Sequence, residues 1–221
     1  MASSLLDVRL QSLRHDDTRI LQDVSFQLMR GETLALVGPS GIGKSSLLRV
    51  IASLNTEFEG SCALDGTCAM VFQEPTLLPW RTVSDNIRVT TGATAKQVNV
   101  ALADVGLAGR CEDYPGQLSL GQQRRLALAR AFAVKPDLLL LDEPFVSLDP
   151  ALVDEMMVLF ARLRAMHNVT TILVTHVAQE AKKLASRIVT LGGNPATIVG
   201  DVQNEGAYFQ LSASGVTSSR S

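Results

Sequence analysis

The sequence contains no apolar stretch approaching the roughly 20 residues that a helix needs to cross a bilayer. Residues 1–10 lack the basic start and long apolar core of a secretion signal, so we expect none. No long basic run is present and the formal net charge is only −2, which argues against a dedicated nucleic-acid-binding protein. Any role at a membrane is therefore expected to come through partner chains.

Cysteine is scarce, and its odd count of three is typical of a reducing compartment. Cys62 and Cys68 flank Asp65-Gly66, a pair that predicts a hairpin turn within residues 60–72. A two-residue turn would point the two thiols to opposite faces of the hairpin, so no disulfide is expected. A metal site is also disfavoured, because no histidine or second cysteine pair lies nearby.

Apolar runs of strand length alternate with stretches of helical periodicity along most of the chain. This alternation predicts an α/β fold with a parallel sheet flanked by helices. The run Leu138 to Leu141 is typical of a central strand buried on both faces. Residues 5–13 and 24–28 instead alternate apolar and polar, which predicts strands with one solvated face. Hydrophobic residues make up 46% of the 221-residue chain, enough for a sizeable core.

A glycine-rich segment follows the predicted strand at 33–37 and precedes a predicted helix. Its spacing of glycine, four residues and then Gly-Lys-Ser is that of a phosphate-binding loop, in which backbone N–H groups converge on an anion. The helix N-terminus adds partial positive charge, Lys44 a full charge for the outer phosphates, and Ser45 a hydroxyl for Mg²⁺. The predicted nucleotide-binding residues here are Gly38, Pro39, Ser40, Gly41, Ile42, Gly43, Lys44, Ser45 and Ser46.

Polar side chains follow two predicted buried strands. Asp142 and Glu143 come directly after the leucine run, and His176 follows the run 171–175. Because ligands of such sheets bind beyond the carboxyl ends of the strands, these residues and the phosphate loop are expected to meet. Asp142 is suited to Mg²⁺, Glu143 to polarising an attacking water, and His176 to the terminal phosphate. Gln73 could reach the metal or the water from a loop.

The chain resembles the ATPase subunit of ATP-binding cassette (ABC) transporters over roughly residues 5–200. The match includes the phosphate loop and the strand-end acids, and in addition two stretches, Leu118-Ser119-Leu120-Gly121-Gln122 and Ser147-Leu148-Asp149. The resemblance implies an ABC ATPase fold, with a phosphate-loop core, an antiparallel β subdomain and a helical subdomain at about 74–134. One domain would span 1–211, followed by a flexible tail at 212–221. The sequence of residues 72–83 is similar to the corresponding segment of importers of nitrate, sulfonates and taurine.

The resemblance also implies partners. Two copies, or one copy and a similar subunit, would sandwich two ATP molecules head to tail. The second chain would contribute Ser119, Gly121 and Gln122 to each site, with Asp149 at the seam. Residues 75–90, with Trp80, would dock on integral-membrane permease subunits. A solute-binding protein would belong to the same system, the chain would lie peripherally on the cytoplasmic side of the cell membrane, and no nucleic acid would be involved.

This sequence departs from the family pattern at several positions. Leu120 replaces a glycine of the signature stretch, so dimer closure is expected to be weaker. Ser46 replaces a threonine, and Val177 follows His176 where an acid is common. His15 falls near the place of the aromatic residue that stacks on adenine. None of these changes removes a reacting group, so ATP hydrolysis is still expected.

Other functions fit the sequence less well. A soluble ABC ATPase acting on nucleic acid or ribosomes would be expected to carry coiled-coil inserts or a second cassette, and neither is present. A module that senses ATP without hydrolysing it is motivated by Leu120 and His15. Exporters often fuse their membrane and ATPase parts, so a free-standing ATPase favours import. The transported solute is not indicated by the residues themselves.

Overall fold

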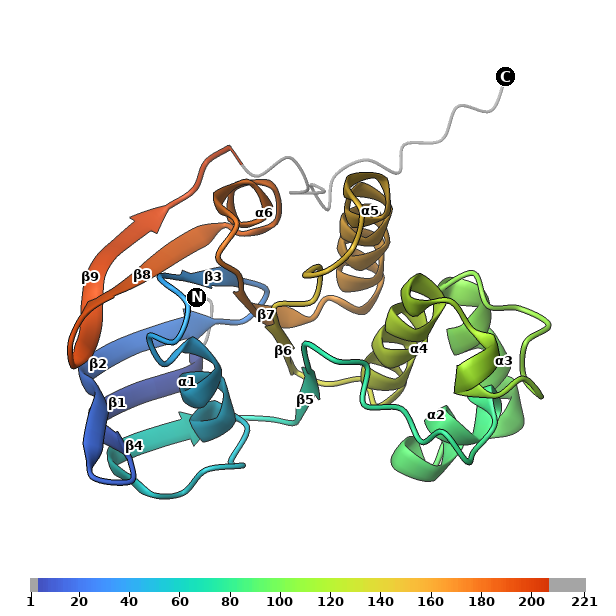
Figure 1. Ribbon diagram of the computed structural model, residues 1–221, viewed down its shortest axis with the longest axis horizontal. Helices are drawn as coiled ribbons and strands as arrows, with labels where there is room; N and C mark the ends of the chain where they lie inside the picture. Colours follow the sequence, from blue (N-terminus) through green and yellow to red (C-terminus); the bar gives the residue numbers. More distant parts are fainter. Residues whose placement is uncertain (1–3, 207–221) are drawn as a thin grey trace.

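The strands of this protein form one mixed, strongly curled sheet with helices along both of its faces (Figure 1). The computed structural model describes residues 4–206. The strands are β1 (Ser4–His15), β2 (Thr18–Met29), β3 (Thr33–Val37), β4 (Phe58–Leu64), β5 (Cys68–Val71), β6 (Leu138–Asp142), β7 (Thr170–Val174), β8 (Arg187–Gly193) and β9 (Ala196–Gln203). The helices are α1 (Lys44–Ile51), α2 (Val83–Thr91), α3 (Ala95–Asp104), the 3₁₀ turn Pro115–Gln117, α4 (Leu120–Ala133), α5 (Pro150–His167) and α6 (Ala178–Leu184).

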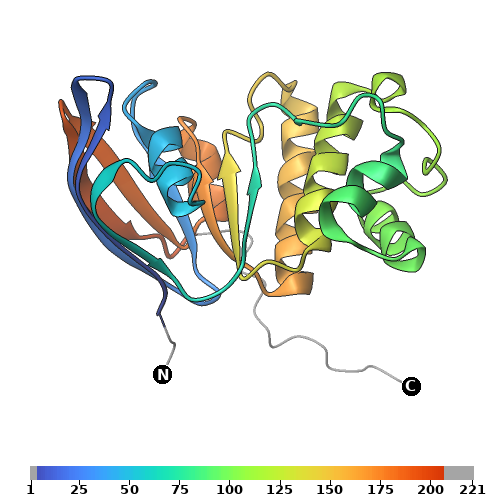
Figure 2. The same cartoon turned by 90° about the horizontal axis from the view of Figure 1, so that it is seen from below.

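Strand pairing divides the sheet into a parallel part and an antiparallel part. The order is β4-β1-β2-β9-β8-β3-β7-β6-β5, and the pairings from β8 through β3, β7 and β6 to β5 are parallel. The β1–β2, β1–β4 and β8–β9 pairings are antiparallel, and one parallel contact, Leu21 with Ala196, joins β2 to β9. Viewed from below, the antiparallel strands curl around α1 at one end, and α2, α3 and α4 gather at the other (Figure 2). The predicted parallel sheet flanked by helices is therefore confirmed.

The leucine run separates two hydrophobic cores. Leu139 and Leu141 pack with α4 and α5 on one face of the sheet. Leu138 and Leu140 pack with α1 and the antiparallel strands on the other face. Because consecutive strand residues point to opposite faces, a strand between two cores must be apolar at every position. The prediction of a strand buried on both faces is confirmed.

The prediction of a hairpin within residues 60–72 is wrong. β4 pairs with β1 at one edge of the sheet, and β5 pairs with β6 at the opposite edge, so the two strands are not neighbours. The connection at Asp65–Thr67 instead crosses between the two edges. The thiols of Cys62 and Cys68 are nevertheless free, as expected.

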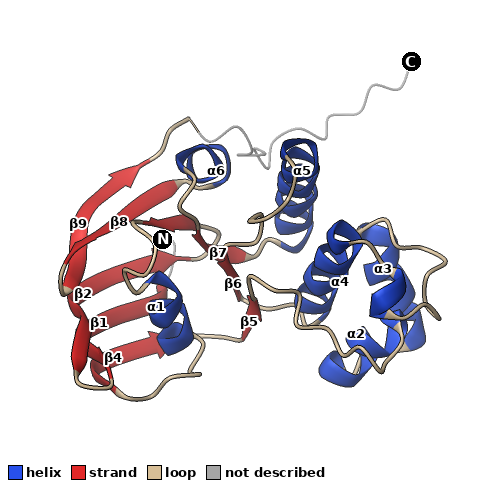
Figure 3. Cartoon of the chain, viewed as in Figure 1, coloured by secondary structure: helices blue, strands red, loops and turns tan. Residues whose placement is uncertain are grey.

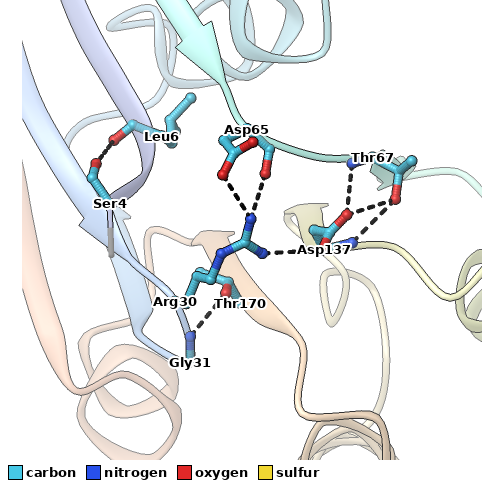
Figure 4. Close-up of polar contacts among 8 residues, drawn as sticks. All are labelled: Ser4, Leu6, Arg30, Gly31, Asp65, Thr67, Asp137 and Thr170. Atoms are coloured by element: carbon cyan, nitrogen blue, oxygen red, sulfur yellow. Dashed lines mark hydrogen bonds and ion pairs between the residues drawn. The ribbon is translucent and has the colours of Figure 1, made fainter. Parts of the chain in front are cut away.

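A polar network fixes this crossing connection (Figure 4). The Arg30 guanidinium donates to Asp137 Oδ1 at 3.0 Å and to the carbonyl oxygen of Asp65 at 2.7 Å. Asp137 Oδ2 also accepts from the backbone N–H of Thr67 at 2.8 Å. Gly66 has φ +149°, and a Cβ there would lie 2.5 Å from the Asp137 carboxylate. Figure 3 shows the connection as a loop running between β4 and β5.

We expect Asp137→Asn to lower the midpoint of thermal unfolding near neutral pH and to change it little in acid. Hydrogen bonds from Thr67 and Arg30 hold the pKa of Asp137 below its usual value. A carboxyl whose folded-state pKa is depressed contributes stability above its unfolded pKa and loses it as pH falls through the folded one. Thermal melts of both proteins across the acid range test this, and parallel curves would contradict it.

Candidate functional site

The loop between β3 and α1 closes around the amine of Lys44. Lys44 Nζ donates to the carbonyl oxygens of Gly38 at 2.9 Å and Pro39 at 2.8 Å. The side chain is 4% exposed, and burial lowers the pKa of Lys44 while the neighbouring Glu143 and Asp142 oppose that shift. The loop is thus a compact turn with a buried cation at its centre, which suits an incoming polyanion.

Glycines of this loop adopt backbone conformations that side chains disfavour. Gly38, Gly41 and Gly43 have φ of +151°, +77° and +103°. A Cβ on Gly38 would lie 2.7 Å from the backbone oxygen of Leu191 in β8, which cannot move independently of the sheet. A Cβ on Gly41 would meet nothing within 4 Å.

These two glycines offer a matched pair of variants. We expect Gly38→Ala to weaken ATP binding by about tenfold or more relative to Gly41→Ala, since both positions have positive φ but only Gly38 adds a clash with backbone. Titration of each purified variant with a fluorescent ATP analogue measures the difference. Equal affinities would show that close packing against β8 does not shape the loop.

The loop meets the end of the leucine strand through one hydrogen bond. Ser45 Oγ donates to Asp142 Oδ1 at 2.8 Å. Asp142 is 7% exposed, and burial raises its pKa while the hydrogen bond from Ser45 opposes the rise. A hydroxyl and a carboxylate side by side are oxygen ligands of the kind Mg²⁺ prefers. No cluster of three or more acidic, histidine or cysteine side chains suited to a metal occurs within residues 4–206.

The neighbouring strand end contributes the second pair of side chains. His176 Nδ1 lies 3.1 Å from Glu143 Oε2. Glu143 has φ +46°, an uncommon conformation for a residue with a side chain, and its N–H donates to the carbonyl oxygen of Val174 at 3.0 Å. The Glu143 side chain is 17% exposed and that of His176 is 48% exposed, so the pair opens to solvent. The predicted meeting of four features at one sheet edge therefore occurs.

Two predicted residues lie apart from this cluster. His15 ends β1 at the tip of the β1–β2 hairpin and is exposed. Gln73 follows β5 and is also exposed. Within the part of the chain that the structure describes, no hydrogen bond or ion pair joins either residue to the cluster around Lys44, Asp142 and Glu143.

The predicted signature stretch forms the N-terminus of α4. Gln122 N donates to Ser119 Oγ at 3.3 Å, and Ser119 N donates to Gln122 Oε1 at 2.9 Å, which is a reciprocal cap. Leu120 is 43% exposed. A Cβ on Gly121 would lie 2.8 Å from Leu152 of α5, the residue whose N–H is capped by Asp149 Oδ1 at 3.0 Å. The N-termini of α4 and α5 are therefore close together.

The signature stretch does not reach the phosphate loop of its own chain. α1 and α4 lie on opposite sides of β5 and β6 in both ribbon views (Figures 1 and 2). Within the described range, residues 4–206, no hydrogen bond or ion pair connects Ser119, Gly121 or Gln122 to the phosphate loop. The phosphate loop and the signature stretch therefore lie on different parts of the surface of one chain.

The segment before α2 exposes a large aromatic side chain on a rigid support. Trp80 is 70% exposed, whereas Leu77 and Leu78 are half-buried. Asn86 of α2 is fully buried, and its amide nitrogen donates to the carbonyl oxygens of Leu78, Arg81 and Thr82 at 2.9–3.2 Å. Sequence reasoning missed Asn86, whose only signal is an amide on an apolar helix face.

Comparisons with known proteins agree on one family. A family model described as "ABC transporter" matches residues 21–146. The aliphatic sulfonates import ATP-binding protein SsuB 2 of Burkholderia cenocepacia is 39% identical over 214 residues, which cover 92% of this chain and 79% of that protein. SsuB 1 of Rhodococcus jostii is 44% identical over 184 residues, covering 80% and 75%.

Solved structures are similar in fold. An ATP-binding cassette protein, determined as a dimer in a post-hydrolysis state with ADP and Pi, superposes with a TM-score of 0.77 at 26% identity, covering 91% of this chain and 99% of that one. The protein cbiO1 of Clostridium perfringens, part of the transporter complex cbiONQ, gives a TM-score of 0.80 at 23% identity, covering 91% and 88%. Among residues 4–206, every helix is too short or too polar to span a bilayer.

Proposed function

Because this chain belongs to the ABC transporter family and is an ATPase that powers solute import through separate membrane-spanning subunits, we propose that its cargo is a small aliphatic sulfonate. The proposal is supported by relatives of 39–44% identity that are named for sulfonate import. A soluble ABC ATPase acting on nucleic acid is not favoured, since the relatives are import subunits. The observation that carries the ATPase chemistry is the meeting of Ser45–Asp142 with Glu143–His176 at adjacent strand ends.

We propose these roles for the site residues. The loop from Gly38 to Ser46 wraps the phosphates of ATP, and the Lys44 amine exchanges its two carbonyl partners for phosphate oxygens. Ser45 and Asp142, with Gln73 from its loop, would hold Mg²⁺, which would neutralise phosphate charge. Glu143 accepts hydrogen bonds from the attacking water and His176 contacts the terminal phosphate. His15 lies against the adenine.

The second half of each ATP site comes from another copy of the chain. Ser119, Gly121 and Gln122 open α4, and a helix N-terminus with free N–H groups is an anion site. Within one chain this terminus lies far from its own phosphate loop, so a head-to-tail partner must bring it to the nucleotide. Asp149, which caps the neighbouring α5, would lie at the same seam.

The remaining partners are membrane and solute-binding proteins. We propose that residues 75–90 dock on the permease, with Trp80 as the anchoring side chain and Asn86 holding its loop rigid. A dedicated solute-binding protein delivers the cargo from the other side. This arrangement places the chain peripherally on the cytoplasmic face of the cell membrane.

Deletion of the gene in its native host tests the cargo. We expect the deletion strain to lose growth with an aliphatic sulfonate as sole sulfur source and to keep growth with sulfate. Complementation with the wild-type gene should restore growth, and complementation with a Lys44→Ala gene should not. Normal growth of the deletion strain on sulfonates, in the absence of a second uptake system, would overturn the assignment.

A further inference from the structure

The buried guanidinium of Arg124 links two parts of the chain that serve different nucleotides. Arg124 lies on α4, five residues after Ser119, and is 7% exposed. Its Nη1 donates to the carbonyl oxygen of Pro144, and its Nη2 donates to that of Val146 at 2.6 Å. Both acceptors belong to the segment 143–149, which begins at Glu143.

This segment has an unusual backbone that needs external support. Glu143 has φ +46° and Ser147 has φ +61°, so two residues with side chains are held in the left-handed region. The segment is anchored at its start by the Glu143 N–H on Val174 and at its end by the Asp149 cap of α5. Between these anchors, the carbonyls of Pro144 and Val146 point at Arg124.

Placing a cation here is costly, because burial lowers the pKa of Arg124 and no carboxylate in residues 4–206 pairs with it. Its Nε also has no hydrogen-bond partner among the described residues. An apolar side chain would fill the same space without this desolvation. What only the guanidinium supplies is a fork of donors that fixes two carbonyls of one loop relative to one helix.

We propose that Arg124 is a positioning residue that couples the two ATP sites of the dimer. The inference rests on the proposed head-to-tail arrangement, in which the N-terminus of α4 contacts the nucleotide held by the partner. The same helix, through Arg124, holds the loop that presents Glu143 to the chain's own nucleotide. Engagement of α4 at one site therefore sets the position of Glu143 at the other, which makes hydrolysis cooperative in ATP.

Arg124→Met, Arg124→Lys and Arg125→Met test the coupling in the full-length protein. Arg125 is the next residue on α4, but its guanidinium reaches Glu155 at 3.1 Å and the Val105 carbonyl instead, so it is the matched control. We expect Arg124→Met to lower kcat by about a hundredfold, with little change in affinity for a fluorescent ATP analogue. The Hill coefficient for ATP should fall to about one, Arg124→Lys should recover part of both quantities, and Arg125→Met should behave as wild type.

Thermal melts show whether each variant is folded. If Arg124→Met does not fold, Arg124→Lys carries the test, because it keeps the cation and reduces the two-carbonyl fork to a single ammonium group. An undiminished Hill coefficient and kcat in a folded Arg124 variant would overturn the coupling, as would a Hill coefficient of one in the wild type. Failure of the proposed function is distinguishable, since a wild-type chain that stays monomeric with Mg·ATP fails before any variant is compared.

Discussion

Replacement of Glu143 by glutamine is expected to reduce ATP turnover by at least about a hundredfold while ATP still binds. The amide is nearly isosteric and can still bond to His176, so the local geometry is kept. It lacks the negative charge that, in the role proposed for Glu143, polarises an attacking water and accepts its proton. Because hydrolysis is blocked after binding, the variant should accumulate as an ATP-bound dimer.

Phosphate release and size-exclusion chromatography with Mg·ATP measure the two effects. Glu180→Gln is the matched control, since Glu180 is a carboxylate at the same end of the sheet that is 8% exposed and accepts a hydrogen bond from Thr175. Burial raises the pKa of Glu180, and a neutral amide can still accept from Thr175. We expect the control to keep most of its turnover. Equal losses in both variants would mean that the assay reports general damage to this sheet edge.

The site was predictable because it is built from local motifs on a regular scaffold. The phosphate loop, Asp142 with Glu143, and His176 each follow a run of apolar residues, and parallel strands bring their carboxyl ends to one edge. The cap of α4 is equally local, because Ser119 and Gln122 interact within one turn. The prediction needed only the identity of the strands and not their order.

Strand order and buried polar contacts were not predictable in the same way. Asp65-Gly66 is typical of a hairpin turn in sequence. In the structure Gly66 instead allows the backbone to pass close to Asp137. Asp137 also accepts a hydrogen bond from Thr67, seventy residues earlier in the chain. Arg124 lies between Gln123 and Arg125 in the sequence, so nothing there marks it as buried, and its acceptors are carbonyl groups that any sequence would supply. Because every residue has a backbone carbonyl group, the residue type at the acceptor does not indicate such a contact.

Two inactive variants are expected to restore ATP hydrolysis when mixed, which is the second large effect. Lys44→Ala removes the cation at the centre of the phosphate loop and disables the site that its own chain holds. Ser119→Asp keeps a side-chain oxygen that can cap α4, so the helix remains intact. In the proposed head-to-tail dimer it also places a carboxylate where the partner's nucleotide carries its phosphates, and the repulsion is expected to disable the partner's site.

The mixture distinguishes an ATP site built by one chain from a site built by two chains, because both substitutions of a mixed dimer fall in the same ATP site. One of its sites pairs the altered phosphate loop with the altered signature, and the other pairs two wild-type halves. With random exchange, half of the dimers are mixed and each has one intact site, so about a quarter of wild-type phosphate release should return if the sites act independently. Coupling through Arg124 would lower that value, whereas no recovery in mixtures that demonstrably exchange subunits would mean that each chain completes its own site. The signature at the start of α4 would then act on the nucleotide of its own chain, and its separation from α1 within one chain would need another explanation.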